Sequence, residues 1–183
     1  MIQISWTALI GLALAVLLLP LKWILCAILA AVVHESAHIV TLILLGANVS
    51  GICIGINGTV IDCWIPDKKR EILSILAGPA GSFLMLLFRN VLPELSACAV
   101  IQGFFNLLPV YPLDGGRILK VLLDQYPPKL FNIFQILGTI LIPICFAAFL
   151  RKRNIYSAFP FLIVLLFSLL RNTPCKEGKI RLQ

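Results

Sequence analysis

Charged residues are scarce in this chain. Only 13% of its 183 residues are Asp, Glu, Lys or Arg, and 60% are hydrophobic, whereas a soluble domain has about a quarter charged and about half apolar residues. The shortage of charge argues against an ordinary soluble domain and predicts an integral membrane protein. The net charge of +7 does not call for a nucleic-acid partner, because membrane proteins collect Lys and Arg in short cytoplasmic loops.

The spacing of the cysteines is uninformative, and an N-terminal basic stretch is missing. The six cysteines show no C-x-x-C or zinc-finger spacing. Four of them have apolar neighbours, and we interpret these as small apolar fillers: Cys26, Cys53, Cys98 and Cys145. No basic stretch precedes the first apolar run, so we interpret that run as an uncleaved membrane helix and not as a secretory signal.

Long apolar runs predict an all-α polytopic membrane protein with about six transmembrane helices, each near the roughly 20 residues that cross a bilayer. The expected runs are 2–19, 21–45, a third that follows Glu71, a fourth that begins near Leu95, 130–150 and 155–170. Gly46 is expected to end the second helix as a C-cap glycine. No repeat or linker divides the chain. We therefore expect a single domain over residues 1–183, with a core at 21–126 and a C-terminal helical hairpin at 129–171.

Residues 48–65 alternate with a period of two. Isoleucines alternate with small or polar residues on both sides of Asn57-Gly58, which is a strong signal for a hairpin turn. With this turn, Ile54 would pair with Ile61. We expect a small membrane-associated β-hairpin, which either accepts an extended peptide at an edge that includes Ile54 or plugs the cytoplasmic mouth of the helix bundle.

The second apolar run contains the sequence H-E-S-A-H from His34 to His38. Residues four apart lie on one face of a helix, so both imidazoles can bind one metal ion. Glu35 is the only carboxylate before Asp62, and a buried acid in a membrane-length apolar segment is costly, which indicates a function. Glu35 is placed to take a proton from a water on the metal. The alternative is a chance match, against which a second motif argues.

This second motif lies in the fourth apolar run and reads N-L-L-P-V-Y-P-L-D-G-G-R from Asn106 to Arg117. Its two prolines disturb the helix, and Asp114 ends an otherwise uncharged run. In one interpretation Asp114 caps a helix that resumes at Arg117. In the other, which we favour, it is the third ligand of a catalytic zinc ion, which needs three protein ligands and one open position. Gly115 and Gly116 would let the backbone approach whatever Asp114 binds.

The two motifs together resemble those of the site-2 protease family of intramembrane metalloproteases, and especially its sporulation branch, the stage IV sporulation protein FB type. The resemblance covers residues 21–117. It implies one Zn²⁺ ion bound by His34, His38 and Asp114, with Glu35 as the catalytic base. Asn106 would be a polar group near the zinc or the scissile carbonyl.

The resemblance also implies a substrate, which would be a membrane-tethered protein such as a pro-sigma or anti-sigma factor, with regulatory membrane proteins as further partners. Two departures from the family stand out. Ser82 occupies a position where many members have Asn, within a small-residue patch at 77–82 that we interpret as a packing surface. In addition, we expect neither a cystathionine-β-synthase-type regulatory domain nor a PDZ domain.

The distribution of Lys and Arg predicts a multi-pass protein of the cell membrane with both termini in the cytoplasm. Six spans in this orientation place ten of the 15 basic residues on the cytoplasmic side. The second and fourth runs then cross in the same direction, which brings His34, His38 and Asp114 to a similar depth. At 1.5 Å per residue, the metal would lie about 12 Å from the cytoplasmic edge.

Two other classes of function remain open for this sequence. The same three residues could form the transport site of a membrane metal carrier, or the chain could be a catalytically inactive membrane scaffold. A carrier rarely needs a lone Glu beside a two-histidine pair, and an inactive scaffold tends to lose that Glu. The protease interpretation is therefore favoured.

Overall fold

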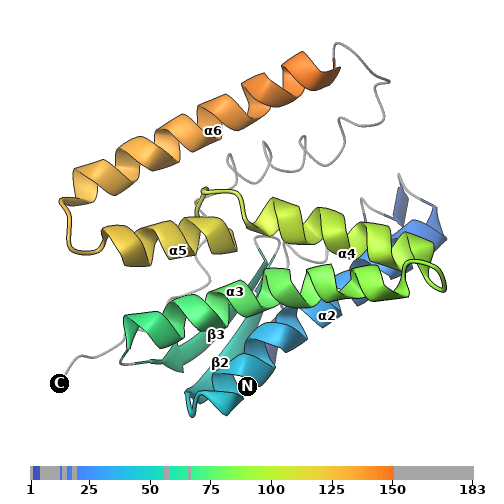
Figure 1. The fold of residues 1–183 in the computed structure, drawn as a ribbon, viewed down its shortest axis with the longest axis horizontal. Coiled ribbons are helices and arrows are strands. Elements are labelled where there is room, and N and C mark those ends of the chain that lie inside the picture. Colours follow the sequence, from blue (N-terminus) through green and yellow to red (C-terminus); the bar gives the residue numbers. More distant parts are fainter. Residues whose placement is uncertain are drawn as a thin grey trace.

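The computed structural model describes residues 2–4, 13, 16–17, 20–55, 58–65 and 67–150. This part of the chain is mostly helical, with α2 (Leu21–Leu44), α3 (Lys68–Leu84), the short 3-10 helix η1 (Met85–Phe88), α4 (Pro93–Asn106), α5 (Asp114–Leu123) and α6 (Pro128–Leu150). One small sheet contains β1 (Ile2–Ile4), β2 (Asn48–Gly55) and β3 (Gly58–Trp64), as Figure 1 shows.

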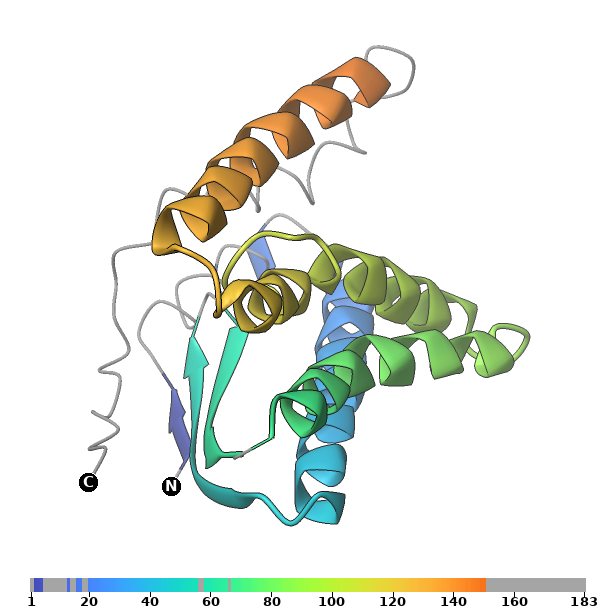
Figure 2. The same cartoon turned by 60° about the vertical axis from the view of Figure 1, so that its left-hand side comes forward.

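Helices α2, α3 and α4 pack against one another and form the centre of the bundle. Helix α5 contacts α3 and α6, so that α6 lies beyond α5 as seen from α3 (Figure 2). The buried faces of α2 and α3 repeat every four residues, at Ala30, His34, His38 and Leu42 on α2 and at Ser74, Gly78 and Ser82 on α3. The small side chains on α3 let the two helices approach closely, as in membrane helix pairs.

Helix α2 ends as the sequence predicts. Gly46 has a φ of 72°, a conformation that glycine adopts without steric cost. Its N–H donates to the carbonyl oxygen of Ile43 (3.0 Å), and the N–H of Ala47 donates to that of Leu42 (2.9 Å). These two bonds form a Schellman motif, so Gly46 ends α2 just past its last turn.

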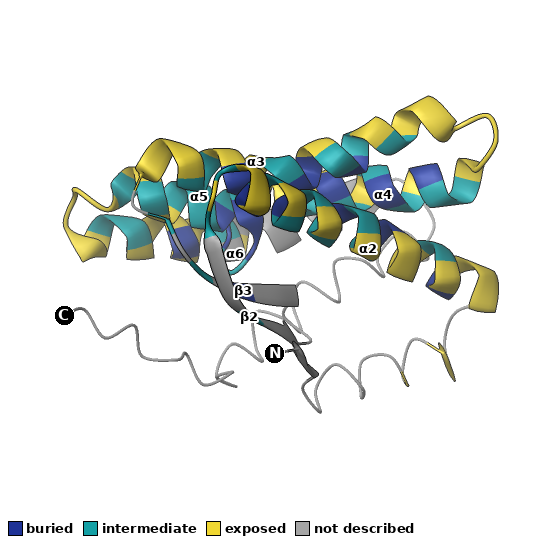
Figure 3. Cartoon of the chain, turned by 90° about the horizontal axis from the view of Figure 1, so that it is seen from below, coloured by how far each residue is buried: buried dark blue, intermediate teal, exposed yellow. Residues whose placement is uncertain are grey.

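The exposed surface of α2 is mostly apolar, while its two histidines face inward. His34 and His38 are buried, whereas large apolar side chains of the same helix are exposed (Figure 3), among them Leu25, Ile28, Leu29, Val32, Val40 and Ile43. A helix of a soluble protein has the opposite pattern, so this arrangement indicates a lipid-facing surface.

Two helical segments, Leu21–Leu44 and Lys68–Phe88, are long and apolar enough to cross a bilayer in the part of the chain that the structure describes. The expected number of spans was about six. The sixth expected run, 155–170, and the basic cluster at 151–153 lie outside the described residues.

The first and fourth expected runs differ from the structure. The first run does not begin as a helix at Ile2, because Ile2–Ile4 form β1 and pair in parallel with residues 52–54 of β2. Most of its remaining residues lie outside the described ranges. The fourth run is not one helix, because α4 ends at Asn106 and α5 begins at Asp114. The intervening loop contains Pro109 and Pro112, which lack a backbone N–H and disfavour a helical conformation in the preceding residue.

Strands β2 and β3 pair in antiparallel fashion where the alternation predicted strands, but the predicted register is wrong by two residues. Ile54 lies opposite Thr59 and not opposite Ile61, and Gly55 lies opposite Gly58. A shift of two residues keeps each side chain on its expected face, since the alternation of a strand has the same period. The expectation of an open edge at Ile54 is also wrong, because β1 pairs with β2 on the side away from β3.

Candidate metal centre

Two consecutive turns of α2 and the first residue of α5 bring three ligand atoms together. His34 Nε2 lies 3.0 Å from Asp114 Oδ2, and His38 Nε2 lies 3.3 Å from the same oxygen. The two Nε2 atoms are themselves 3.3 Å apart. The exposed fractions of the three residues are 1%, 5% and 6%, respectively, so all three side chains are buried. The structure thus joins the two motifs that lie 76 residues apart in the chain, from His38 to Asp114.

These separations fit a tetrahedral zinc ion. With Zn–N and Zn–O bonds of about 2.0 to 2.1 Å, two ligand atoms of a tetrahedron lie about 3.3 to 3.4 Å apart. Two imidazole nitrogens and one carboxylate oxygen are also ligands that zinc favours at catalytic sites, where a fourth position is left for water. His34, His38 and Asp114 therefore form a candidate zinc site.

Hydrogen bonds to the far side of each imidazole leave its Nε2 atom for a metal. His38 Nδ1 donates to the main-chain carbonyl oxygen of Ser74 at 2.8 Å, because a carbonyl can only accept. The neutral ring then carries its lone pair on Nε2, which is the atom that faces the cluster. His34 Nδ1 lies 2.9 Å from the buried hydroxyl of Ser82, whose position orients this ring in the same way.

Gly78 on α3 provides the space in which the imidazoles lie. A Cβ atom at this position would come within 2.1 Å of His38 Nε2 and within 2.8 Å of His34 Nε2. Both distances are far below van der Waals contact, and the metal-facing nitrogens would have to move. The α3 helix therefore supports the cluster with three residues at four-residue spacing, namely Ser74, Gly78 and Ser82.

The loop that precedes α5 packs closely against the first turn of this helix, which begins at Asp114. Helix α5 begins at Asp114, its N-cap is Leu113, and the carboxylate points at the histidines. It does not cap a helix that resumes at Arg117, since Arg117 already lies within α5. The second carboxylate oxygen, Oδ1, is 3.9 Å from the Arg117 guanidinium, which partly neutralises its charge.

The two glycines after Asp114 have a different role from the one expected. A Cβ on Gly115 would lie 2.1 Å from the carbonyl oxygen of Leu107, and a Cβ on Gly116 would lie 2.3 Å from the backbone nitrogen of Tyr111. They let the first turn of α5 press against the backbone of its own preceding loop. This contact fixes the direction in which the Asp114 side chain projects from α5.

Glu35 and Asn106, the two predicted catalytic residues, come from different helices. Glu35 is half-buried on α2, next to His34 in sequence. Asn106 is the last residue of α4, and its Nδ2 atom lies 3.2 Å from His34 Nε2. The structure therefore brings a polar amide to the ligand cluster.

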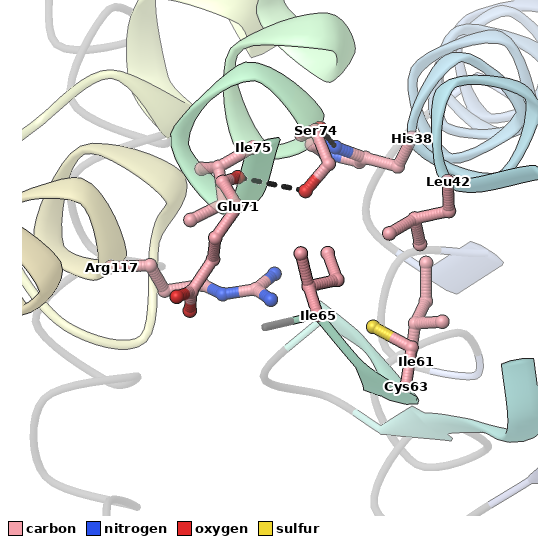
Figure 4. Close-up of a pocket in the computed structure, with 9 residues that line it drawn as sticks. All are labelled: His38, Leu42, Ile61, Cys63, Ile65, Glu71, Ser74, Ile75 and Arg117. Carbon is pink, nitrogen blue, oxygen red and sulfur yellow. Dashed lines mark hydrogen bonds between the residues drawn. The ribbon is translucent and has the colours of Figure 1, made fainter. Parts of the chain in front are cut away.

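A cavity of about 250 Å³ lies beside His38, bounded by α2, α3, α5 and the β3 segment (Figure 4). Glu71 and Arg117 line it together with the Cys63 thiol and Ser74, and the apolar part of its wall consists of Leu42, Ile61, Ile65 and Ile75. At about 30 Å³ per water molecule, a space of this size has room for several waters next to a metal ligand.

Sequence reasoning missed the supporting residues. The patch at 77–82 was interpreted as a packing surface, but Gly78 and Ser82 contact the histidines directly. A usable signal existed in the four-residue spacing of Ser74, Gly78 and Ser82, which matches that of the two histidines. Residues four apart share one helix face, so this face of α3 can lie against the histidine face of α2 once the two helices are known to be neighbours.

Comparisons with known proteins agree with this geometry. Residues 67–148 match the model of peptidase family M50. A protein of Methanocaldococcus jannaschii named as a zinc metalloprotease is 29% identical over 111 residues, which cover 52% of this chain and 32% of the relative. This chain thus spans about a third of that relative's length.

The solved structure of a site-2 protease from Methanocaldococcus jannaschii has the same fold. Its TM-score is 0.68 at 23% identity, and the alignment covers 98% of this chain and 94% of the other chain. The matched family segment contains Asn106 and Asp114, while His34 and His38 lie before it. The family match covers less than half of this chain, and the solved structure shares its fold; neither distinguishes the sporulation branch of the site-2 proteases from the others.

Proposed function

We propose that this protein is a zinc-dependent intramembrane endopeptidase of the site-2 protease type. The observation that carries the proposal is the buried cluster of His34, His38 and Asp114 with Glu35 adjacent on an apolar helix. The match to family M50 supports the same activity. The substrate is a peptide bond in or near the membrane-spanning segment of another protein.

The chain's own residues divide the reaction between them. A bound zinc ion supplies a Lewis acid that activates water and polarises the scissile carbonyl. Glu35 accepts the proton of the attacking water and passes it to the leaving amine, so that one peptide bond and one water give a carboxylate and an amine. The Asn106 amide, 3.2 Å from His34 Nε2, donates to the carbonyl oxygen as negative charge develops there.

The substrate must be unwound before it is cut. In a membrane-spanning helix every carbonyl is hydrogen-bonded within the helix, so the scissile bond becomes accessible only in an extended segment. The cavity beside His38 gives water a place next to the metal site. A single-span protein with a weak helix near one membrane face is the kind of substrate this site fits.

Three predictions from the sequence are part of this proposal: the branch of the family, the class of substrate and the membrane topology. The spacing from Asn106 to Asp114, with prolines between, supports the sporulation branch of the family. The substrate is then a membrane-tethered pro-sigma or anti-sigma factor. The excess of Lys and Arg on one side supports a multi-pass cell-membrane protein with both termini in the cytoplasm.

The proposal is tested with the full chain reconstituted in liposomes together with single-span substrate proteins. Wild-type protein loaded with zinc should give a cleavage product whose new terminus maps by mass spectrometry to the membrane segment. Removal of zinc with a chelator should stop cleavage, and added zinc should restore it.

Glu35→Gln is the decisive variant, because the amide cannot accept the proton of the water. It should keep full zinc occupancy and lose cleavage by about 10²- to 10⁴-fold, the range for loss of a general base. Cleavage that survives this substitution rejects Glu35 as the base. Zinc that crosses the liposome membrane without any cleavage would instead indicate a metal carrier.

A further inference from the structure

Helix α6 contains a buried amide within an otherwise apolar stretch. Gln135 is 1% exposed, and its side chain hydrogen-bonds to the backbone of the loop between α4 and α5. Its Oε1 atom accepts from the N–H of Tyr111 at 2.6 Å, and its Nε2 atom donates to the carbonyl oxygen of Pro109 at 3.4 Å. A glutamine in an apolar helix is expensive to bury without partners, and here the partners are backbone groups that the prolines remove from helical pairing.

One face of α6 contacts this loop at three successive positions. The Phe131 ring lies edge-on to Tyr111, with 6.5 Å between the ring centroids. A Cβ on Gly138 would lie 3.0 Å from Val110 Cγ2. Phe131, Gln135 and Gly138 have the spacing i, i+4 and i+7, so they share one helix face. The contacts described above are with residues 109–111, on the loop between α4 and α5.

The same loop backbone is also contacted by α5. Gly116 packs against the backbone nitrogen of Tyr111, where a Cβ would lie 2.3 Å away. Tyr111 therefore contacts both Gln135 of α6 and the first turn of α5. That first turn begins with Asp114, and the loop itself begins directly after Asn106. A shift of the loop would displace both side chains from His34.

We propose that Gln135 is a positioning residue for the metal site, which it holds in shape through the backbone of residues 109–111. It touches neither the metal ligands nor a substrate. By fixing Tyr111 it sets the place of Asp114, and with it the affinity of the site for zinc. This inference rests on the proposed zinc-dependent function, and its test measures zinc binding and not proteolysis.

The test compares zinc affinities of the full chain in detergent, by competition with a chelator of known affinity. Gln135→Leu should weaken zinc binding by about tenfold, the lower end of the range for residues that orient a metal ligand. Gln135→Glu, with its buried carboxyl protonated, keeps an acceptor for the Tyr111 N–H and a donor for the Pro109 carbonyl, and should retain most of the affinity. The matched control is Asn132→Leu, which removes an exposed amide from the same helix and should leave zinc binding unchanged.

A double-mutant cycle separates positioning from general stability. In an Asp114→Asn background, Gln135→Leu should cause little further loss, because its effect passes through Asp114. If Gln135→Leu does not fold, Gly138→Ala provides the second variant, since its methyl group pushes against Val110 and should also weaken zinc binding.

Two outcomes overturn the inference. One is a folded Gln135→Leu or Gly138→Ala protein that binds zinc as tightly as Asn132→Leu, and the other is an undiminished Gln135→Leu effect in the Asp114→Asn background. Either result leaves the proposed protease function standing. A wild-type protein that binds zinc but cleaves no substrate would reject the protease function and leave the role of Gln135 intact.

Discussion

His38 Nδ1 donates a hydrogen bond of 2.8 Å to the main-chain carbonyl oxygen of Ser74. A carbonyl cannot donate, so this bond alone fixes the tautomer in which His38 presents a lone pair at Nε2. The neighbouring ligand is held differently, because His34 Nδ1 meets the Ser82 hydroxyl at 2.9 Å. One histidine thus depends on the backbone of α3 and the other on a side chain.

This difference gives a prediction for two buried serines of α3. Ser82→Ala should weaken zinc binding by about 10- to 100-fold, the range for loss of an outer hydrogen bond to a metal-binding histidine. Ser74→Ala should leave zinc affinity within about twofold of wild type. The substitution keeps the main-chain carbonyl that accepts the hydrogen bond from His38 Nδ1, so this imidazole stays oriented. Chelator competition measures both. Equal losses in the two variants would contradict the assigned roles.

Gly78→Ala should abolish zinc binding more completely than either serine change. The added methyl carbon would lie 2.1 Å from His38 Nε2, so the imidazoles would have to leave their positions in the cluster or the two helices would have to separate. Elemental analysis of purified protein should show zinc far below one equivalent. Ala80→Ser, on the exposed side of α3, serves as the control and should retain zinc. Full zinc occupancy in Gly78→Ala would show that the two helices can separate at this point.

Asp114→Asn should lower zinc affinity and, with it, cleavage at a fixed zinc concentration. A neutral amide oxygen is a poorer zinc ligand than a carboxylate, and the Arg117 guanidinium at 3.9 Å would lose its counter-charge. Excess zinc should restore part of the activity. Asp67→Asn, at the exposed N-cap of α3, is the matched control, since Asn caps a helix as well as Asp does. Unchanged zinc affinity in Asp114→Asn would remove this residue from the ligand set.

Asn106→Ala should separate catalysis from metal binding. The amide at 3.2 Å from His34 Nε2 is assigned to the substrate carbonyl, so kcat should fall by about 10²- to 10³-fold, the usual cost of one donor to a developing oxyanion. Zinc occupancy should remain near that of wild type. Asn132→Ala, on the exposed face of α6, controls for loss of an amide. Loss of zinc in Asn106→Ala would make the residue a support for His34 instead.

Several features of the site could be predicted from local sequence. The H-E-x-x-H spacing depends only on the pitch of one helix, and α2 extends from Leu21 to Leu44, close to the expected 21–45. Asp114 was expected near the histidines, and the structure places its carboxylate there. The stop at Gly46 needs no information beyond neighbouring residues, because a Schellman motif is a local structure.

Other features required contacts between distant segments. The register of β2 and β3 differs by two residues from the pattern-based expectation, since alternation with period two fits either register. The pairing of Ile2–Ile4 with β2 also joins segments about 50 residues apart, a contact that no local pattern specifies.

Sequence alone was enough to predict the residues of the candidate site: two histidines four residues apart with a glutamate between them, and a later aspartate that follows two prolines. Each of these patterns is short in range and is set by backbone geometry. The tertiary structure decided what surrounds them. That Ser82 and a carbonyl orient the imidazoles, that Gly78 makes room for them, and that Gln135 holds the loop before Asp114 all depend on which helix faces share an interface. Close packing between segments far apart in the chain selects those contacts, and no local pattern encodes it.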